Sequence, residues 1–471
     1  MLIALLSQAS ALAAFAALSD NYYATDPTLT SVYNDTVVHA LLRHLALDAV
    51  QHAPSYTRHG PARACGCLPP QLVADPAIVL ARLLQATAVA DGAECLAPAR
   101  AAAVRGLIGL TCSGVFAVKD APVATVTAQL CRSLGDYSVD SRGDIGSTVR
   151  MAGMQGLVTC LLHWAQHGSE GLSVAMVLEA FCLLLKQASE KIDRVRTQAG
   201  SCLLELARQL PAVYPDMMTD PNVRSVVTTL LGLPPDFDWA AGSVVYPMLA
   251  DLLPLAPLRK YLLQGFVATV GGLTESLIQH ASAALLNVLD GASLELVTAI
   301  AQDLVDVGGA DLADLRVTMA YFDTLTTLLS SGGMDALRLD AVVPLQMHQQ
   351  VAKVYKGTSN VKLLLRCVEV SAALLAFEAA QKAALKTGLV LICNKYPRVG
   401  SCTCMHASAL LCFLPSPQHS LASRFARLPL KPWSWACRLR LPPVPGYQSS
   451  TRTACWTHLG KPSPAIENAS A

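Results

Sequence analysis

Apolar residues recur at helical spacing along most of the chain, and the pattern is clearest between Leu258 and Asp290. Leu258, Leu262, Phe266 and Val270 follow one another every four residues, so they share one face of a helix. A second apolar stripe follows at helical spacing, formed by Leu277, Ile278, Ala281, Leu285, Val288 and Leu289. Two helices cannot bury both stripes alone, so the pattern predicts further helices on either side.

The two stripes are separated by Gly271-Gly272, which predicts the end of the first helix. Glycine takes the left-handed backbone conformation at no steric cost, and helices commonly end in that conformation. Thr274 is then expected to cap the second helix, with Glu275 in its first turn, where the helix dipole favours negative charge. The stretch therefore predicts a pair of helices joined by a short turn.

Helical spacing continues on both sides of this pair. Further helices are predicted at 37–50, 77–88, 98–116 and 122–134, with a loop rich in Pro, Gly, His and Arg at 51–70. A proline-rich interruption at 210–247 predicts a long loop containing short helices. Runs of alternating β-branched residues bounded by hairpin turns are nearly absent up to residue 396. The expected fold class is all-α.

Two segments show an internal repeat. Asp144, Arg150 and the leucines that follow have counterparts in Asp193, Arg196 and a second leucine pair, and the two arginines are 46 residues apart. This distance lies within the period of HEAT and armadillo repeats, which is about 40–47 residues. Looser units follow at 314–329, 360–377 and 378–396. We therefore predict a HEAT/armadillo-type solenoid, in which each turn aspartate caps a helix and meets an arginine of a neighbouring repeat.

Composition narrows the classes of function. The chain is 53% apolar and 15% charged with a net charge of +1, so no electrostatic preference for nucleic acid or an anionic membrane is visible in the total. Many of the fifteen cysteines lie in apolar helical runs, which is typical of reduced cysteines used as small hydrophobic residues. The pairs Cys65/Cys67 and Cys402/Cys404 do not have the spacing of zinc ligands, and we expect no metal and no cofactor.

The first eighteen residues allow two interpretations. Residues 1–18 are apolar and uncharged with alanine-rich triplets, as in a signal peptide, yet no Lys or Arg precedes Arg43. The same composition suits a helix packed in the array. No later window offers about 18 clean apolar residues, so we expect no membrane-spanning helix and no membrane insertion.

The character of the sequence changes after Val399. Residues 400–471 hold nine of the 27 prolines and three of the five tryptophans, with seven Lys or Arg against the single acid Glu467. The stretch is interpreted either as a basic partner-binding tail or as sequence without a selected fold, such as read-through past an exon boundary. We expect it to be disordered.

Catalytic signatures are missing from the sequence. It contains no phosphate-binding G-x-x-x-x-G-K-[ST] loop, no G-x-S-x-G elbow and no H-E-x-x-H, and the eleven histidines are scattered. We therefore expect a protein that is not an enzyme. The densest charged segments are candidate partner contacts, although loops tied by Asp–Arg pairs would look the same. The candidates are Asp140, Arg142, Asp144, Arg150, Lys191, Asp193, Arg194 and Arg196.

Three motifs carry a resemblance to a known family. Residues 136–146 (DYSVDSRGDIG), 187–194 (QASEKIDR) and 271–276 (GGLTES, followed by Ile278 and His280) occur in this order. Together with the less specific LGLP of residues 231–234, they resemble the C-terminal region of tubulin-folding cofactor D, over about residues 115–399. Family members are much longer, so the chain is expected to be a C-terminal fragment or a truncated gene model.

The resemblance implies a domain organisation and a function. It predicts divergent helical repeats at 1–135, a cofactor D C-terminal-like helical domain at 136–399, and the tail at 400–471. The implied function is a chaperone scaffold that binds β-tubulin and assembles the αβ heterodimer with cofactors C and E. The same complex stimulates GTP hydrolysis by tubulin, and an Arf-like small GTPase is a further implied partner. The implied location is the cytoplasm, in association with the cytoskeleton.

Two other classes of function remain open at this point. One is a HEAT/armadillo adaptor unrelated to tubulin, for instance in transport. The other is a secreted or membrane-attached protein, which depends entirely on how residues 1–18 are interpreted.

Overall fold

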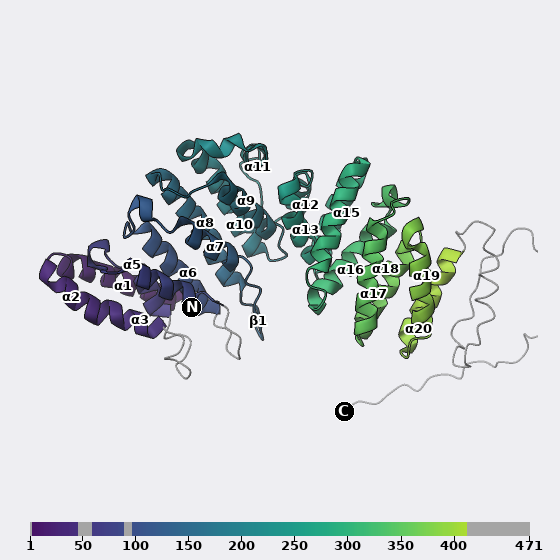
Figure 1. Ribbon diagram of the computed structural model, residues 1–471, viewed down its shortest axis with the longest axis horizontal. Helices are drawn as coiled ribbons and strands as arrows, with labels where there is room; N and C mark the ends of the chain where they lie inside the picture. The colour runs from purple at the N-terminus through teal and green to yellow at the C-terminus, as the bar shows by residue number, and fades with distance from the viewer. Residues whose placement is uncertain (1, 46–58, 89–96, 412–471) are drawn as a thin grey trace, which may run out of the picture. The chain divides into compact units, whose positions relative to one another are not determined.

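The computed structural model describes residues 2–45, 59–88 and 97–411, and almost all regular structure in these ranges is helical (Figure 1). This confirms the predicted all-α, helical-repeat fold. The α-helices are α1 Leu2–Leu18, α2 Thr30–Tyr33, α3 His39–Leu45, α4 His59–Cys65, α5 Pro76–Ala86, α6 Ala97–Cys112, α7 Val123–Ser133, α8 Ser147–His167, α9 Val174–Ala188, α10 Asp193–Val213, α11 Pro221–Leu231, α12 Gly242–Ala250, α13 Ala256–Val270, α14 Glu275–Leu289, α15 Leu294–Gly309, α16 Leu315–Ser330, α17 Val343–Gly357, α18 Val361–Leu374, α19 Glu378–Ile392 and α20 Pro397–Leu411.

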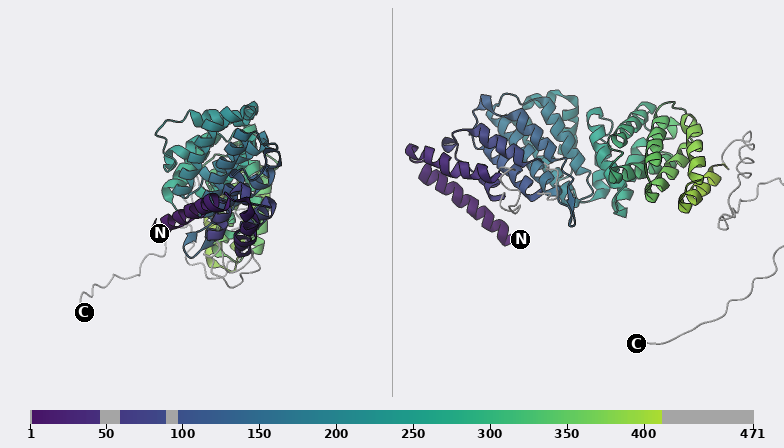
Figure 2. Two further views of the ribbon diagram at one scale, coloured as in Figure 1. Left: turned by 90° about the vertical axis from the view of Figure 1, so that its left-hand side faces the viewer. Right: turned by 60° about the horizontal axis from the view of Figure 1, so that its bottom comes forward.

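Short elements connect some of these helices. Five-residue π-helical turns are η1 Ser19–Tyr23 and η3 Asn34–Val38, and 3₁₀ turns are η2 Pro27–Leu29, η6 Pro70–Leu72, η7 Val118–Asp120, η8 Pro215–Thr219 and η9 Asp335–Leu337. The strands of the described ranges are β1 Val139–Asp140 and β2 Gly143–Asp144, which pair antiparallel with Val139 opposite Asp144. This small hairpin extends beyond the helix ends in both Figure 1 and the right-hand view of Figure 2.

The helices pack in two rows that follow the chain. Helices α4, α6, α8 and α10 contact one another in sequence, and α12, α14, α16, α18 and α20 continue in the same manner. The second row contains α7, α9, α13, α15, α17 and α19, each against the next. Because most helices contact a sequence neighbour and a counterpart one repeat away, the apolar core is continuous along the described helices, as expected of stacked repeats.

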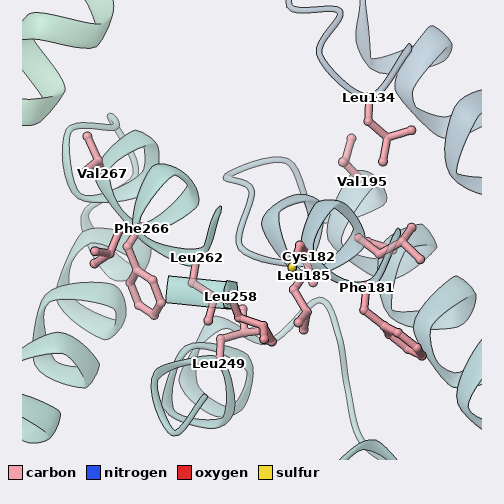
Figure 3. Packing of buried hydrophobic residues seen from close by; sticks show 14 of the residues in the cluster. Leu134, Phe181, Cys182, Leu185, Val195, Leu249, Leu258, Leu262, Phe266 and Val267 are labelled. Atoms are coloured by element: carbon pink, nitrogen blue, oxygen red, sulfur yellow. The ribbon is translucent and has the colours of Figure 1, made fainter. Parts of the chain in front are cut away.

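The core joins successive repeats through aliphatic and aromatic side chains. Leu185 of α9 lies beside Leu249 of α12 and Leu258 of α13 in Figure 3, and all three are fully buried. Leu262 and Phe266 continue the stripe of α13 and are also inaccessible to solvent. The four-residue spacing that predicted this face therefore corresponds to the most buried side of α13.

The Gly-Gly turn ends α13 as predicted, but the reason is different. Gly271 has φ −82°, which is not left-handed, and a Cβ atom there would lie 2.1 Å from the Cα of Ala320 in α16. Glycine is needed because another helix approaches closely. Thr274 occupies the N-cap position of α14, although its side chain makes no capping hydrogen bond.

Other predicted boundaries also shift. Helix α6 ends at Cys112, four residues before its predicted end, and Gly114 follows in the turn with φ +83°. The predicted loop at 51–70 contains α4 over His59–Cys65, and the predicted helix at 37–50 is divided between η3 and α3. Residues 46–58 lie outside the described residues. The proline-rich interruption contains η8, α11 and α12, in agreement with the prediction.

The helical region continues past the predicted boundary at residue 400. Helix α20 crosses this position, and Val399 and Thr403, four residues apart, are both buried on the face that meets α18 and α19. The predicted disorder of the remaining tail concerns residues 412–471, which lie outside the described residues.

The N-terminal segment is helical from Leu2 to Leu18. Phe15 packs against the core, and Ser19, which follows the helix, donates to or accepts from the Tyr33 hydroxyl at 2.8 Å. Along the ranges that the structure describes, no helix combines the length and the apolar composition needed to cross a bilayer.

Candidate interaction edge

The loops that carry the three sequence motifs lie at one end of the helices. Arg194 Nη2 donates to Ser147 Oγ at 2.7 Å, which ties the second motif to the start of α8 directly after the first. Residues of the second and third motifs line one shared depression together with the loop before α12. We call the surface formed by residues 136–146, 189–194, 239–243 and 271–280 the motif edge.

A buried arginine ties the hairpin to the second motif. Arg150 of α8 is completely buried and donates to Asp144, to the carbonyl of Asp136 and to Gln187 Oε1 at 3.0 Å. Glu190 lies 3.9 Å away, in the loop between α9 and α10. Burial alone would lower the pKa of Arg150, but the bond to Asp144 and the charge of Glu190 outweigh it, so the net shift is upward. The arginine is therefore held charged inside the protein.

The repeated arginine, Arg196, has the same role one repeat later. It is completely buried, and its guanidinium donates to Asp193, to the carbonyl of Glu190 and to the carbonyls of Trp239 and Ala240. The loop before α12 is thus fixed onto α10. Upstream, Arg100 of α6 pairs with Asp136 at 2.6 Å, and both side chains are almost fully buried. Three arginines in succession join loops of adjacent repeats.

This arrangement corrects one detail of the predicted repeat. Asp144 and Asp193 each pair with the arginine of their own helix, not with an arginine of a neighbouring repeat. Asp144 also accepts from the backbone N–H of Ser147, as expected of a capping residue, whereas the N-terminus of α10 has no side-chain cap. The arginine makes the contacts between repeats, because its five N–H groups reach several acceptors at once. Arg150 donates to the Gln187 side chain of α9, and Arg196 donates to the carbonyls of Trp239 and Ala240.

The eight candidate residues therefore divide into two groups. Arg150 and Arg196 are inaccessible to a partner, and Asp144 is partly covered and bonded to Arg150. Asp140 and Arg142 form an exposed pair at 2.6 Å at the hairpin tip, which lowers the pKa of Asp140 chiefly through the side-chain hydrogen bond. Exposed side chains are also presented by Lys191, Asp193 and Arg194. These five residues remain available for a contact.

The hairpin is held by an aromatic residue that the sequence did not single out as structural. Tyr137 places its ring 4.3 Å from the Arg150 guanidinium carbon, and its hydroxyl accepts from Gln187 Nε2 at 3.3 Å. Desolvation, together with the charge of Glu190, raises the pKa of Tyr137. Tyr137 nevertheless remains 37% exposed, so part of its side chain is accessible on the motif edge.

The depression on the motif edge lies between α10, α12 and α14 and has a volume of about 540 Å³. We call it the edge pocket. It is lined by Lys191, Ile192, Asp193, Ala240, Ala241, Gly242, Ser243, Thr274, Ser276, Leu277 and His280. Of the predicted candidates it includes Lys191 and Asp193. The rest of its lining comes from Ile192 of the second motif, from the N-terminal part of α14, and from the start of α12 with the loop before it, which carried no sequence signal.

Several residues that build the edge were missed by sequence reasoning. Trp239 is 5% exposed and packs its ring on Gly200, where a Cβ atom would lie 2.0 Å from the ring. Gln187 and Glu190 belong to the second motif but were not among the candidates, which were chosen from the densest clusters of Asp, Arg and Lys. Ser147 accepts from Arg194. The internal repeat could have identified them, because the residues around Arg150 and around Arg196 occupy equivalent positions in successive repeats.

Comparison with protein families finds a match to this region. Residues 178–362 match the family model described as the C terminus of tubulin folding cofactor D. The matched range contains the second and third motifs and the complete edge pocket. The first motif, at residues 136–146, precedes it.

Proposed function

Because residues 178–362 match the tubulin folding cofactor D C-terminal family model, we propose that this chain is a non-enzymatic scaffold that binds β-tubulin during assembly of the αβ heterodimer. In this proposal it acts with cofactors C and E, and the assembled complex stimulates GTP hydrolysis by tubulin. An Arf-like small GTPase is a further proposed partner. The proposed location is the cytoplasm, in association with the cytoskeleton. The family match is the observation that carries the proposal.

The architecture supports this proposal on physical grounds. A stack of helix pairs offers an extended surface, so it can hold a folded subunit through many small contacts without enclosing it. The motif edge supplies charged and apolar groups for such contacts. Arg142 is exposed at the hairpin tip, Lys191 is exposed beside the edge pocket, and Leu273 is fully exposed in the Gly-Gly turn.

We propose no catalytic residue for this chain. An arginine that stabilises a phosphoryl transition state must reach the nucleotide of a partner. Arg150 and Arg196 cannot do so, because both are fully buried and donate to acceptors of the chain itself. In this proposal, the chain affects GTP hydrolysis by positioning its partners.

A binding experiment tests the proposal. Purified chain is immobilised and incubated with tubulin heterodimer, alone and with cofactors C and E, and retained β-tubulin is quantified. The unmodified chain is expected to retain β-tubulin. Arg142→Glu combined with Arg194→Glu is expected to reduce retention without changing helical content measured by circular dichroism.

A matched variant controls for charge alone. Arg338→Glu combined with Lys382→Glu also reverses two exposed cations, but away from the motif edge, and is expected to retain β-tubulin normally. If retention and helical content fall together in the Arg142/Arg194 variant, those residues are structural ties. Failure of both the unmodified chain and a longer family member to associate with tubulin or the cofactors would refute the proposed function.

A further inference from the structure

The edge pocket has a positive balance of charge. Its acidic lining residue, Asp193, is bonded to the buried guanidinium of Arg196 at 2.6 Å, so the negative charge is already compensated. Lys191 and His280 also line the pocket, and neither has a hydrogen-bonding or ionic partner within the described part of the chain. The uncompensated ionisable groups of the lining are therefore basic.

Hydrogen-bond donors without partners also favour an anionic ligand. The hydroxyl groups of Ser243, Thr274 and Ser276 line the pocket, and none of them bonds to another group of the described chain. Neither α12 nor α14 has a side-chain cap at its N-terminus, and both helices begin at the pocket wall. A ligand that accepts hydrogen bonds and carries negative charge would satisfy these donors together.

An apolar side chain lies next to this polar pocket. Leu273 is 101% exposed, the largest value among the exposed large apolar residues of the described chain, and it directly precedes the pocket residue Thr274. Leu277, by contrast, is 9% exposed and forms part of the pocket floor. An exposed leucine beside a cluster of donors suits a peptide with acidic and apolar residues in succession, and does not suit a free inorganic anion.

We propose that the edge pocket binds an acidic peptide segment of a partner protein. Carboxylates of the segment accept from Lys191 and from the hydroxyls of Thr274 and Ser276, and an adjacent apolar side chain packs on Leu273. The inference deepens the proposed function and rests on it only for the identity of the partner. The pocket chemistry alone specifies the peptide class, so peptide binding is measurable without tubulin.

Fluorescence anisotropy with the full chain tests this inference. The probe is a fluorescein-labelled peptide rich in glutamate with a single phenylalanine, and the control peptide has glutamine at every glutamate. The acidic peptide is expected to bind, and its affinity should fall with added salt because exposed charges are screened. Lys191→Glu is expected to weaken binding by about tenfold, since it converts an attraction into a repulsion of similar size.

Two further variants separate the contributions. Leu273→Ser is expected to weaken binding of the acidic peptide and to have no effect when the phenylalanine of the peptide is replaced by alanine. Lys382→Glu, an exposed charge reversal on α19, is expected to leave binding unchanged. Circular dichroism verifies that each variant is folded.

Three outcomes would overturn the inference. The first is equal binding of the glutamate and glutamine peptides, and the second is an unchanged peptide affinity in folded Lys191→Glu. The third is displacement of the peptide by millimolar inorganic phosphate, together with equal peptide affinity for the unmodified chain and the Leu273→Ser variant. The last outcome would assign the pocket to a free anion. Peptide binding, with no tubulin or cofactor retained by this chain or by a longer family member, would leave the pocket assignment intact and refute the proposed function, so the two failures are distinguishable.

Discussion

Buried arginines give single residues a large effect in this protein. Arg150 and Arg196 have no solvent exposure, and they link the starts of their helices to the end of α9 and to the loop before α12, respectively. Removing one partner of a buried ion pair is more damaging than removing both, because the remaining charge is left without compensation. For the exposed pair of Asp140 and Arg142, removing one partner should change the free energy of unfolding very little, because water solvates the remaining charge.

Arg150→Met is expected to lower the free energy of unfolding by about 3–5 kcal/mol, because Asp144 and buried Glu190 would lose the guanidinium that they share. Adding Glu190→Gln to this variant should restore part of the loss. Arg142→Met, which removes a cation at the exposed hairpin tip, should leave the urea midpoint unchanged. Urea unfolding of the three variants measures these differences, and equal midpoints for Arg150→Met and the unmodified chain would contradict the buried network.

A buried histidine makes stability depend on pH. His348 of α17 is 6% exposed and its Nε2 lies 2.9 Å from Thr387 Oγ1 of α19. Desolvation lowers the pKa of His348 below its ordinary value of 6.5, and the charge of Lys356 acts in the same direction, although a backbone hydrogen bond to Ala383 opposes it. The unfolded chain therefore binds the proton more readily than the folded chain.

The direction in which pH changes the stability follows from this difference in pKa between the folded and unfolded chain. The contribution of His348 to stability is fully present above pH 6.5 and is lost as the pH falls toward the lower pKa of the folded state. His348→Gln should therefore lose less stability than the unmodified chain between about pH 7.5 and about pH 5.5. Urea midpoints at both values test this. His59 and His163, whose pKa values burial also lowers, are present in both proteins and cancel in the comparison.

At the scale of elements, glycines permit close approach between helices. A Cβ atom at Gly265 of α13 would lie 1.6 Å from Ser189 Oγ and 2.7 Å from Ser189 Cβ. Ser189 lies at the motif edge, and its carbonyl accepts from Thr269 of α13 at 2.9 Å. The second motif is thus positioned by direct packing of α13 against the end of α9.

Gly265→Ala is expected to destabilise the protein by about 1–3 kcal/mol, because the added methyl group forces α13 away from Ser189. Gly357→Ala is the matched control. A Cβ atom there would meet nothing within 4 Å, so this substitution at the end of α17 should be neutral or stabilising. Thermal unfolding followed by circular dichroism compares the two, and a Gly265→Ala melting temperature equal to or above that of the unmodified chain would contradict the proposed packing.

Helical periodicity was sufficient to predict most elements, because burial on one face leaves a spacing of three and four residues in the sequence. The stripe of Leu258, Leu262 and Phe266 is buried as expected. Features that depend on contacts between distant residues were not predictable. Gly271 was assigned a conformational role, whereas it faces Ala320 of a helix 49 positions later.

The sequence predicted where the candidate residues lie better than it predicted what each of them does. The charged segments were correctly expected at loops between repeats, and the Asp–Arg pairs that tie those loops are present. Arg142 and Arg150 have similar sequence surroundings, yet one is exposed at a hairpin tip and the other is fully buried. Local sequence cannot separate them, because burial of Arg150 is decided by Gln187 and Glu190, about forty residues away.

At the scale of the whole molecule, the stacked helices present two edges. Helix α14 begins at the edge pocket and ends away from it, and Gly333, which follows α16, lies against Leu286 and Leu289 at that far end. The backbone N–H of Glu378, which follows the loop after α18, donates to the carbonyl of Arg338 at the same end. We call residues 290–293, 331–342 and 375–377 the opposite edge. A partner that binds the motif edge should leave these loops exposed.

Hydrogen–deuterium exchange of the chain, free and in complex with β-tubulin, tests the central claim most directly. The account predicts that complex formation slows exchange at the motif edge, chiefly at 189–194, 239–243 and 271–280, because bound surfaces lose access to solvent. Exchange at the opposite edge should be unchanged. Slowed exchange confined to the opposite edge, or no change anywhere at saturating β-tubulin, would contradict the account.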